Sequence, residues 1–177
     1  MSKAVFLDRD GTLSEHVHYL SDPEEFRLMP GAVRALKLLS GAGYKLVVVT
    51  NQSGVARGLF TEKTLARIHE RMRALLVDGG VRLDGVYYCP HNPDAGCSCR
   101  KPATGMIDTA VSELGIEREG SFMVGDQTAD VLLGGNAGLK TILVATGYGG
   151  KDKDIAVRPD YTAPDLYEAA LIILGKR

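Results

Sequence analysis

The sequence lacks a long apolar run, an excess of either charge and any internal repeat, and each absence excludes a class of protein. No segment reaches bilayer length in apolar residues, so no membrane-spanning helix is expected. Lys and Arg number 21 against 22 Asp and Glu, so no overall field attracts nucleic acid or anionic lipid. We therefore expect no membrane partner and no nucleic-acid partner.

Cysteine is scarce, with three in 177 residues, and the N-terminus does not resemble a signal peptide because the apolar stretch before Asp8 is too short. We therefore expect a cytoplasmic protein whose cysteines stay reduced, and their close grouping indicates metal binding before disulfide bonds. A length of 177 residues with 45% hydrophobic side chains suits one globular domain over residues 1–177. Such a core needs no obligatory partner, and we expect a monomer.

Short apolar segments rich in β-branched residues alternate with amphipathic segments of helical period. Five short strands, all buried, are expected at 4–7, 45–50, 85–88, 122–124 and 141–144. Two helices are expected to begin after Pro30–Gly31 and after Thr61, and two more are expected at 105–114 and 128–137. A short extended piece at Tyr161 and a last helix, which ends near Leu174, are expected to complete the chain. This alternation predicts an α/β fold: a mainly parallel, Rossmann-like sheet in three layers, covered by helices on both faces.

Polar motifs follow the expected strands, where the crevice of an open parallel sheet lies. Asp8 and Asp10 come after the first strand, and in extended chain both carboxylates face one side. Such a pair raises one pKa or recruits a divalent cation. The hydroxyl and amide groups of residues 50–53 suit a phosphoryl group. Asp126 and Asp130 would complete an oxygen site for Mg²⁺, although polar turns and a helix cap are the simpler alternatives.

Four soft or borderline ligands lie close together after the third expected strand. They are Cys89, His91, Cys97 and Cys99. Their number and pairwise spacing predict a closed tetrahedral Zn²⁺ site of Cys₃His type. The alternatives are a disulfide, which leaves one of the three cysteines unpaired, and buried free thiols. Because such a zinc site has no open position, the zinc loop, about residues 89–102, is expected to have a structural role.

Two basic residues, Arg100 and Lys101, end the cysteine motif. A rigid loop would present Arg100 as a bidentate fork and Lys101 as a point charge for a substrate anion, and a solvated basic turn is the alternative. His69 is expected on the solvated surface of a helix, and residues 151–154 are expected to form a solvated loop. His16 and His18 either contact substrate or only lie in a loop.

The strand-end motifs resemble those of the haloacid-dehalogenase (HAD) superfamily. They are Phe6–Thr12, Thr50–Asn51, Lys101 and Gly125–Asp130. The second aspartate, Asp10, is typical of the phosphatase branches. The segments 50–58, 88–91 and 97–102 are similar to the D-glycero-D-manno-heptose 1,7-bisphosphate phosphatase family, and this resemblance covers nearly the whole chain.

The resemblance implies a Mg²⁺-dependent phosphatase that removes the C7 phosphate of this sugar bisphosphate through a phosphoaspartyl intermediate, in the synthesis of ADP-heptose or GDP-heptose precursors. Only one helix and one strand fit between Asp10 and Thr50, so no large cap domain is expected.

The resemblance also implies a role for each site residue. Asp8 would be the nucleophile and Asp10 the general acid and base, with Thr50 and Lys101 on the phosphoryl oxygens; Asp8, the Asp10 carbonyl and Asp126 would hold Mg²⁺, supported by Asp130. The implied substrate contacts are His16, Val17, His18, Tyr19, Asn51, Gln52, Ser53, Arg100 and Gln127. Gln127 stands where the family often has Lys, which removes one possible anion contact.

Other interpretations remain open. Histidinol-phosphate phosphatases share the cysteine motif and a similarly short zinc loop. A receiver-like signalling domain also has an acceptor Asp, a hydroxyl residue and a Lys, but it lacks a partner equivalent to Asp10 beside the acceptor. A zinc-stabilised binding module with a decayed active site is disfavoured by the intact Asp8, Thr50 and Lys101.

Overall fold

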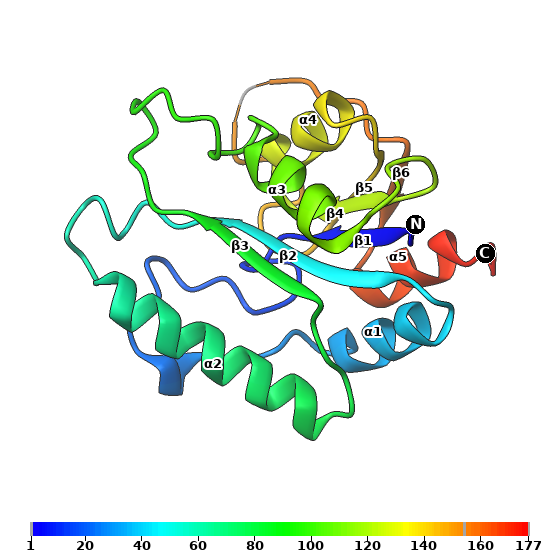
Figure 1. Cartoon of the computed structure of the whole chain (residues 1–177), viewed down its shortest axis with the longest axis horizontal. Coiled ribbons are helices and arrows are strands. Elements are labelled where there is room, and N and C mark those ends of the chain that lie inside the picture. Colours follow the sequence, from blue (N-terminus) through cyan, green and yellow to red (C-terminus); the bar gives the residue numbers. More distant parts are fainter. Residues whose placement is uncertain (1, 154, 177) are drawn as a thin grey trace.

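A six-stranded parallel sheet organises the computed structural model, which describes residues 2–153 and 155–176 (Figure 1). Its strands are β1 (Ala4–Leu7), β2 (Lys45–Asn51), β3 (Gly85–Cys89), β4 (Phe122–Gly125), β5 (Lys140–Val144) and β6 (Tyr161–Ala163). The strand order is β3-β2-β1-β4-β5-β6, and every neighbouring pair is parallel. The predicted parallel α/β fold is confirmed, and the extended piece at Tyr161 is a sixth strand.

Four α-helices and one short 3₁₀ helix lie between the described strands, and a fifth α-helix follows β6. They are η1 (Pro23–Glu25), α1 (Ala32–Gly41), α2 (Glu62–Asp78), α3 (Gly105–Leu114), α4 (Thr128–Asn136) and α5 (Leu166–Ile173). The Thr61 hydroxyl caps α2 by accepting a hydrogen bond from the Thr64 N–H at 3.1 Å, as its sequence position predicts. In the described chain between β1 and β2 the regular elements are η1 and α1, in agreement with the absence of a large cap domain.

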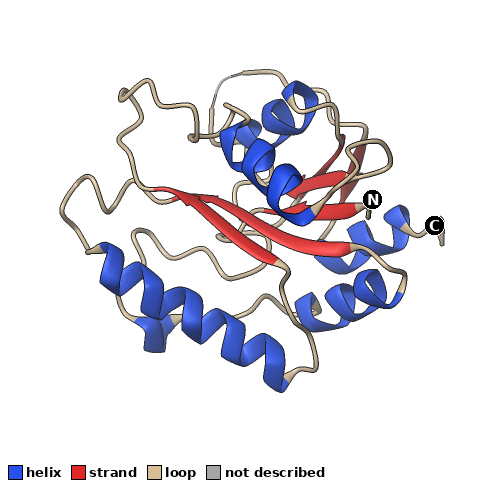
Figure 2. Ribbon diagram, in the orientation of Figure 1, coloured by secondary structure: helices blue, strands red, loops and turns tan. Residues whose placement is uncertain are grey.

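The period-two alternation of the strands divides the core between two faces of the sheet. Val5 and Leu7 of β1 pack in one cluster with residues from α1, α2 and α5. Ala4 and Phe6 of the same strand pack in a second cluster with α3 and α4. Figure 2 shows the sheet between these two groups of helices. The chain therefore forms the three layers predicted from its sequence.

Two expectations about exposure are wrong. His69 on α2 is buried, with 8% of its surface exposed, because α2 packs against the sheet and turns this side inward. β3 is only partly buried because it lies at the edge of the sheet, and Tyr88 is 37% exposed. The expected loop 151–154 ends at Asp154, which lies outside the described residues.

Within the described chain, every helix is too short or too polar to cross a membrane.

The strand register places the polar motifs beside one another at the carboxyl edge of the sheet. Leu7 of β1 is paired with Val48 of β2 on one side and with Val124 of β4 on the other. One residue further along lies Asp8, whose backbone N–H donates to the Val124 carbonyl at 3.0 Å. The loops after β1, β2 and β4 consequently converge at a single point.

Candidate active site

A buried lysine joins two carboxylates at the carboxyl edge of the sheet. The ammonium of Lys101 lies 2.7 Å from Asp8 Oδ1 and 2.7 Å from Asp130 Oδ1. It donates a third hydrogen bond to the Val49 carbonyl at 3.1 Å. With their side chains at most 3% exposed, these ions are shielded from water, and such a cluster is stable only when its charges are paired. Lys101 thus connects the loop after β3 to the ends of β1 and β2 and to α4.

Asp126 is the third carboxylate of the cluster. Suitable ligand atoms of Asp8, Asp126 and Asp130 all lie within 4.8 Å of one another. Burial and then the negative charge of Asp8 raise the pKa of Asp126 to about 8. Burial likewise raises the pKa of Asp130 to about 6, against the pull of Lys101. For Lys101, burial opposes the charged form, but attraction to Asp130 and Asp8 outweighs it and raises the pKa above the ordinary lysine value.

The carboxylate of Asp126 is enclosed by backbone from two loops. The Tyr148 N–H donates to Asp126 Oδ2 at 2.8 Å, and the Thr12 hydroxyl donates to Oδ1 at 3.3 Å. Gly11 and Gly147 both have positive φ, and a Cβ on either would overlap the Asp126 carboxylate. Glycine is therefore required at both positions for the backbone to approach this closely.

A cavity of about 310 Å³ opens above this cluster. Its lining includes the residues predicted as catalytic or substrate-binding: Asp8, Asp10, His16, Val17, His18, Tyr19, Thr50, Asn51, Gln52, Ser53, Arg100, Lys101 and Gln127. Asp126 and Asp130 are completely or almost completely buried. The structure therefore brings the sequence-predicted groups around one cavity, from the loops after β1, β2, β3 and β4.

The residues at the end of β2 hydrogen-bond to other protein groups of the site. Asn51 Oδ1 accepts from the Lys101 N–H at 3.0 Å, and Asn51 Nδ2 donates to the Lys101 carbonyl at 3.3 Å. The Gln52 amide donates to Asp10 Oδ2 at 2.9 Å and to the Thr50 hydroxyl at 3.0 Å. Besides lining the cavity, these amides hold Lys101, Asp10 and Thr50 in place.

One wall of the cavity was not found from the sequence. Tyr148, Asp152 and Lys153, from the loop after β5, line the cavity with the predicted residues. This loop is attached to the site: the Thr128 N–H and hydroxyl both donate to the Asp152 carboxylate at 2.8 Å. Asp152 and Lys153, which belong to the segment expected to be a solvated loop, are therefore part of the pocket. In the sequence, the signal for this wall is a lysine, Lys153, in the loop after an expected strand. A single basic residue is too weak a signal to predict a binding site.

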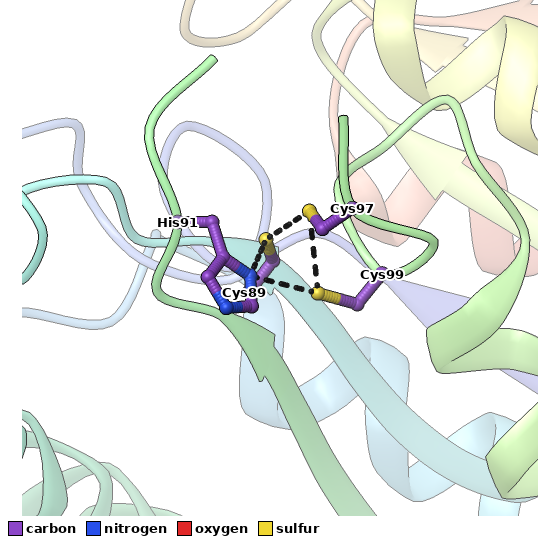
Figure 3. A group of neighbouring side chains, drawn as sticks. All are labelled: Cys89, His91, Cys97 and Cys99. Carbon is purple, nitrogen blue, oxygen red and sulfur yellow. Dashed lines mark hydrogen bonds between the residues drawn. The ribbon is translucent and has the colours of Figure 1, made fainter. Parts of the chain in front are cut away.

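The cysteine loop brings four potential metal ligands together (Figure 3). Cys89 ends β3, and its sulfur lies 3.5 Å from His91 Nδ1 and 3.6 Å from the Cys97 sulfur. The Cys99 sulfur lies 3.3 Å from His91 Nδ1 and 3.6 Å from the Cys97 sulfur. Zinc bonds of ~2.3 Å to sulfur and ~2.0 Å to nitrogen give a tetrahedron with edges of about 3.5–3.8 Å, close to these distances.

The thiols of this cluster are free rather than joined as disulfides. Burial opposes the thiolate of Cys97, but donation from the Arg100 backbone N–H and from the neighbouring thiols lowers its pKa to about 6. A thiolate is the form in which cysteine binds metal. The geometry and donor set fit a four-coordinate zinc ion.

Comparisons with known proteins agree with this architecture. A family model described as HAD-hydrolase-like matches residues 98–169. A D-glycero-beta-D-manno-heptose-1,7-bisphosphate 7-phosphatase from Pasteurella multocida is 47% identical over 154 residues, which cover 83% of this chain and 84% of the relative. A D-glycero-D-manno-heptose-1,7-bisphosphate 7-phosphatase from Chlorobaculum tepidum is 37% identical over 99% of this chain and 96% of its own.

Solved structures give the same result. The crystal structure of a D,D-heptose 1,7-bisphosphate phosphatase from B. bronchiseptica, complexed with magnesium and phosphate, is similar with a TM-score of 0.89 at 35% identity. The similarity covers 99% of both chains. With its four strand-end motifs around one cavity and relatives this similar along most of its length, the chain belongs to the heptose-1,7-bisphosphate 7-phosphatase family of HAD-like hydrolases.

Proposed function

We propose that this protein is a Mg²⁺-dependent phosphatase that removes the C7 phosphate of D-glycero-D-manno-heptose 1,7-bisphosphate, in the synthesis of ADP-heptose or GDP-heptose precursors. The observation that carries the proposal is the ion cluster of Lys101 with Asp8 and Asp130 at the cavity, next to Asp10. It pairs a nucleophilic carboxylate with a fixed positive charge. The relatives named above supply the substrate class.

In the first half-reaction, an Asp8 carboxylate oxygen attacks phosphorus and the bond from phosphorus to the C7 oxygen breaks. Asp10 gives its proton to the departing sugar oxygen, which leaves as an alcohol. Lys101 and Thr50 both line the cavity, and in this proposal the Lys101 charge and the Thr50 hydroxyl stabilise the negative oxygens of the transferred group. Preformed hydrogen bonds from Gln52 to Asp10 and Thr50 reduce reorganisation during this step.

In the second half-reaction, Asp10 takes a proton from water while the water oxygen attacks the phosphorus of the phosphoaspartate. The bond between phosphorus and the Asp8 oxygen breaks, which restores the carboxylate and releases inorganic phosphate. A carboxylate suits this role because it is nucleophilic at neutral pH and its acyl phosphate hydrolyses readily once water is activated.

The carboxylate cluster fits Mg²⁺. Three buried carboxylates surround one ammonium, so the protein supplies more negative than positive charge at this point. Asp8, the Asp10 carbonyl and Asp126 would hold the ion, and Asp130 would fix Lys101 beside it. Bound Mg²⁺ neutralises charge that develops on the phosphoryl oxygens. Zn²⁺ in the loop formed by Cys89, His91, Cys97 and Cys99 would have a structural role, because these four residues would fill all four positions of a tetrahedral ion.

Phosphate release from a panel of substrates tests the proposal. The panel contains both anomers of the heptose 1,7-bisphosphate and histidinol phosphate, each with Mg²⁺ and with EDTA. We expect Mg²⁺-dependent release from at least one heptose anomer, at a kcat/KM well above that for histidinol phosphate. An Asp8→Asn variant should release no phosphate, and Asp78→Asn, an exposed carboxylate at the end of α2, is the matched control.

Two results contradict the proposal. Faster release from histidinol phosphate would make this ester the substrate, hydrolysed by the same phosphoaspartyl chemistry. Stoichiometric labelling without sustained release, from any phosphate ester, favours a receiver-like phosphoacceptor.

A further inference from the structure

An arginine between the two motif aspartates is buried and contacts the general acid. Arg9 is 1% exposed, although it belongs to the loop after β1. Its Nε donates to Asp10 Oδ1 at 3.0 Å and its NH2 donates to Asp10 Oδ2 at 2.9 Å. This bidentate fork fixes both the position and the plane of the Asp10 carboxylate. The roles derived above for Asp8 and Asp10 do not use Arg9.

A second contact fixes the arginine itself. Arg9 NH1 lies 3.3 Å from Nε2 of His69, which projects inward from α2. Arginine can only donate, so His69 Nε2 must be the unprotonated acceptor of this bond. Burial, followed by the positive charge of Arg9, lowers the pKa of His69 to about 3, which agrees with a neutral ring. The imidazole also packs beside Tyr88, with ring centroids 5.8 Å apart.

The backbone of Arg9 is equally constrained. Its carbonyl accepts hydrogen bonds from the Leu13 N–H at 3.0 Å, the Ser14 N–H at 2.8 Å and the Ser14 hydroxyl at 3.1 Å. The turn therefore holds the backbone of Arg9, and His69 on α2 holds its guanidinium. Neither the backbone nor the guanidinium can shift without breaking buried hydrogen bonds.

The donors leave the two Asp10 oxygens unequal. Oδ2 accepts from Arg9 NH2 and from Gln52 Nε2, whereas Oδ1 accepts one hydrogen bond, from Arg9 Nε. A carboxylate offers about four lone-pair sites, so the remaining one lies on Oδ1. The Asp10 side chain is 16% exposed, and the residue lines the cavity. Oδ1 is consequently the oxygen that can still bind the proton that Asp10 gives to the substrate.

We propose that Arg9 and His69 are positioning residues, which hold Asp10 so that Oδ1 delivers the proton to the leaving oxygen. The inference rests on the phosphatase chemistry proposed above and deepens it. It requires no contact of His69 with substrate, because His69 acts through Arg9. Without the His69 acceptor the guanidinium can rotate, and the Asp10 carboxylate bonded to it moves as well.

The choice of leaving group separates positioning of the acid from a general structural effect. A sugar alcohol is a poor leaving group and needs the Asp10 proton, whereas p-nitrophenolate leaves without one. The ratio kcat/KM reports the steps through departure of the leaving group. We therefore compare kcat/KM for the heptose bisphosphate and for p-nitrophenyl phosphate in wild type, His69→Leu and His69→Gln.

For His69→Leu we expect kcat/KM on the heptose bisphosphate to fall about 10- to 100-fold, the range expected for a displaced acid. On p-nitrophenyl phosphate it should change less than about twofold, because departure of that leaving group gains little from general acid catalysis. His69→Gln, whose side-chain oxygen can accept from Arg9 near the position of Nε2, should restore most of the loss. Glu70→Gln, at the next and exposed position of α2, is the matched control and should match wild type on both substrates.

Equal losses on both substrates, or no loss on either, overturn the proposal. If His69→Leu does not fold, Arg9→Lys provides the same comparison, since an ammonium keeps the charge but cannot form the fork. Should wild type prefer histidinol phosphate, that ester also has an alcohol leaving group and replaces the heptose substrate. In that case the proposed function fails while the positioning role is still tested.

Discussion

Asp126 is expected to destabilise the metal-free protein, and Asp126→Asn tests this directly. Its carboxylate is completely buried, and burial and then Asp8 raise its pKa to about 8. A carboxyl group whose pKa is raised on folding stabilises the folded state at low pH. That contribution is fully present below the unfolded pKa of about 3.9 and is lost as pH rises toward the folded value. Near neutral pH, the ionisation of Asp126 in the unfolded chain therefore favours unfolding.

The size of the effect follows from the two pKa values. At about pH 7, a shift from about 3.9 to about 8 costs roughly 4 kcal/mol of folding stability. Asparagine has no such cost and has the same shape. It keeps one acceptor for the Tyr148 N–H, while its amide N–H can donate to the Thr12 hydroxyl. With about 1–2 kcal/mol lost from weaker hydrogen bonds, the net gain is about 2–3 kcal/mol, or about 4–12 °C in melting temperature.

Thermal and urea unfolding in EDTA, at several pH values, measure this gain. The stability difference between Asp126→Asn and wild type should grow by about 3–4 kcal/mol between about pH 5 and pH 8. Added Mg²⁺ should stabilise wild type but not the variant, because the proposed carboxylate site exists only in the folded state and the variant lacks one of its ligands. Asp78→Asn, which changes an exposed carboxylate, is the control. A variant less stable than wild type in EDTA, or a difference independent of pH, refutes the reasoning.

Three further predictions concern the cavity and the zinc loop. Lys101→Met should abolish phosphate release and lower the unfolding free energy in urea by about 3 kcal/mol, because two buried carboxylates lose their cation; unchanged stability contradicts this. Cys97→Ser should lower zinc content and melting temperature together, unlike the neighbouring Ser98→Ala, and an unaltered metal assay refutes the zinc site. Lys153→Gln should raise KM for the bisphosphate about 2- to 5-fold at constant kcat, whereas Lys151→Gln should not.

Local sequence signals were sufficient for the fold. The strands were predictable because apolar, β-branched segments such as Leu46–Val49 can be buried on both faces only in a parallel sheet covered by helices. Thr61 was recognisable as the cap of α2 because capping depends on residues a few positions apart. The cysteine loop was recognisable for the same reason, since most of its ligand spacing is local.

Contacts between distant segments could not be predicted in this way. Whether a histidine on a helix is buried depends on which face packs against the sheet, and His69 hydrogen-bonds to Arg9, 60 residues away in the sequence. The loop after β5 contains no strong motif. It becomes part of the site because the Tyr148 N–H reaches Asp126 and the Thr128 N–H and hydroxyl reach Asp152.

The amino-acid sequence by itself determined the layered α/β fold, the carboxylates at the strand ends and the grouping of four potential metal ligands, because these follow from periodicity and short spacings. Only the tertiary structure decided which donors contact each carboxylate: Lys101 on Asp8 and Asp130, Arg9 and Gln52 on Asp10. The physical reason is that buried charges must be paired by whichever groups the packing of distant segments brings within hydrogen-bond distance.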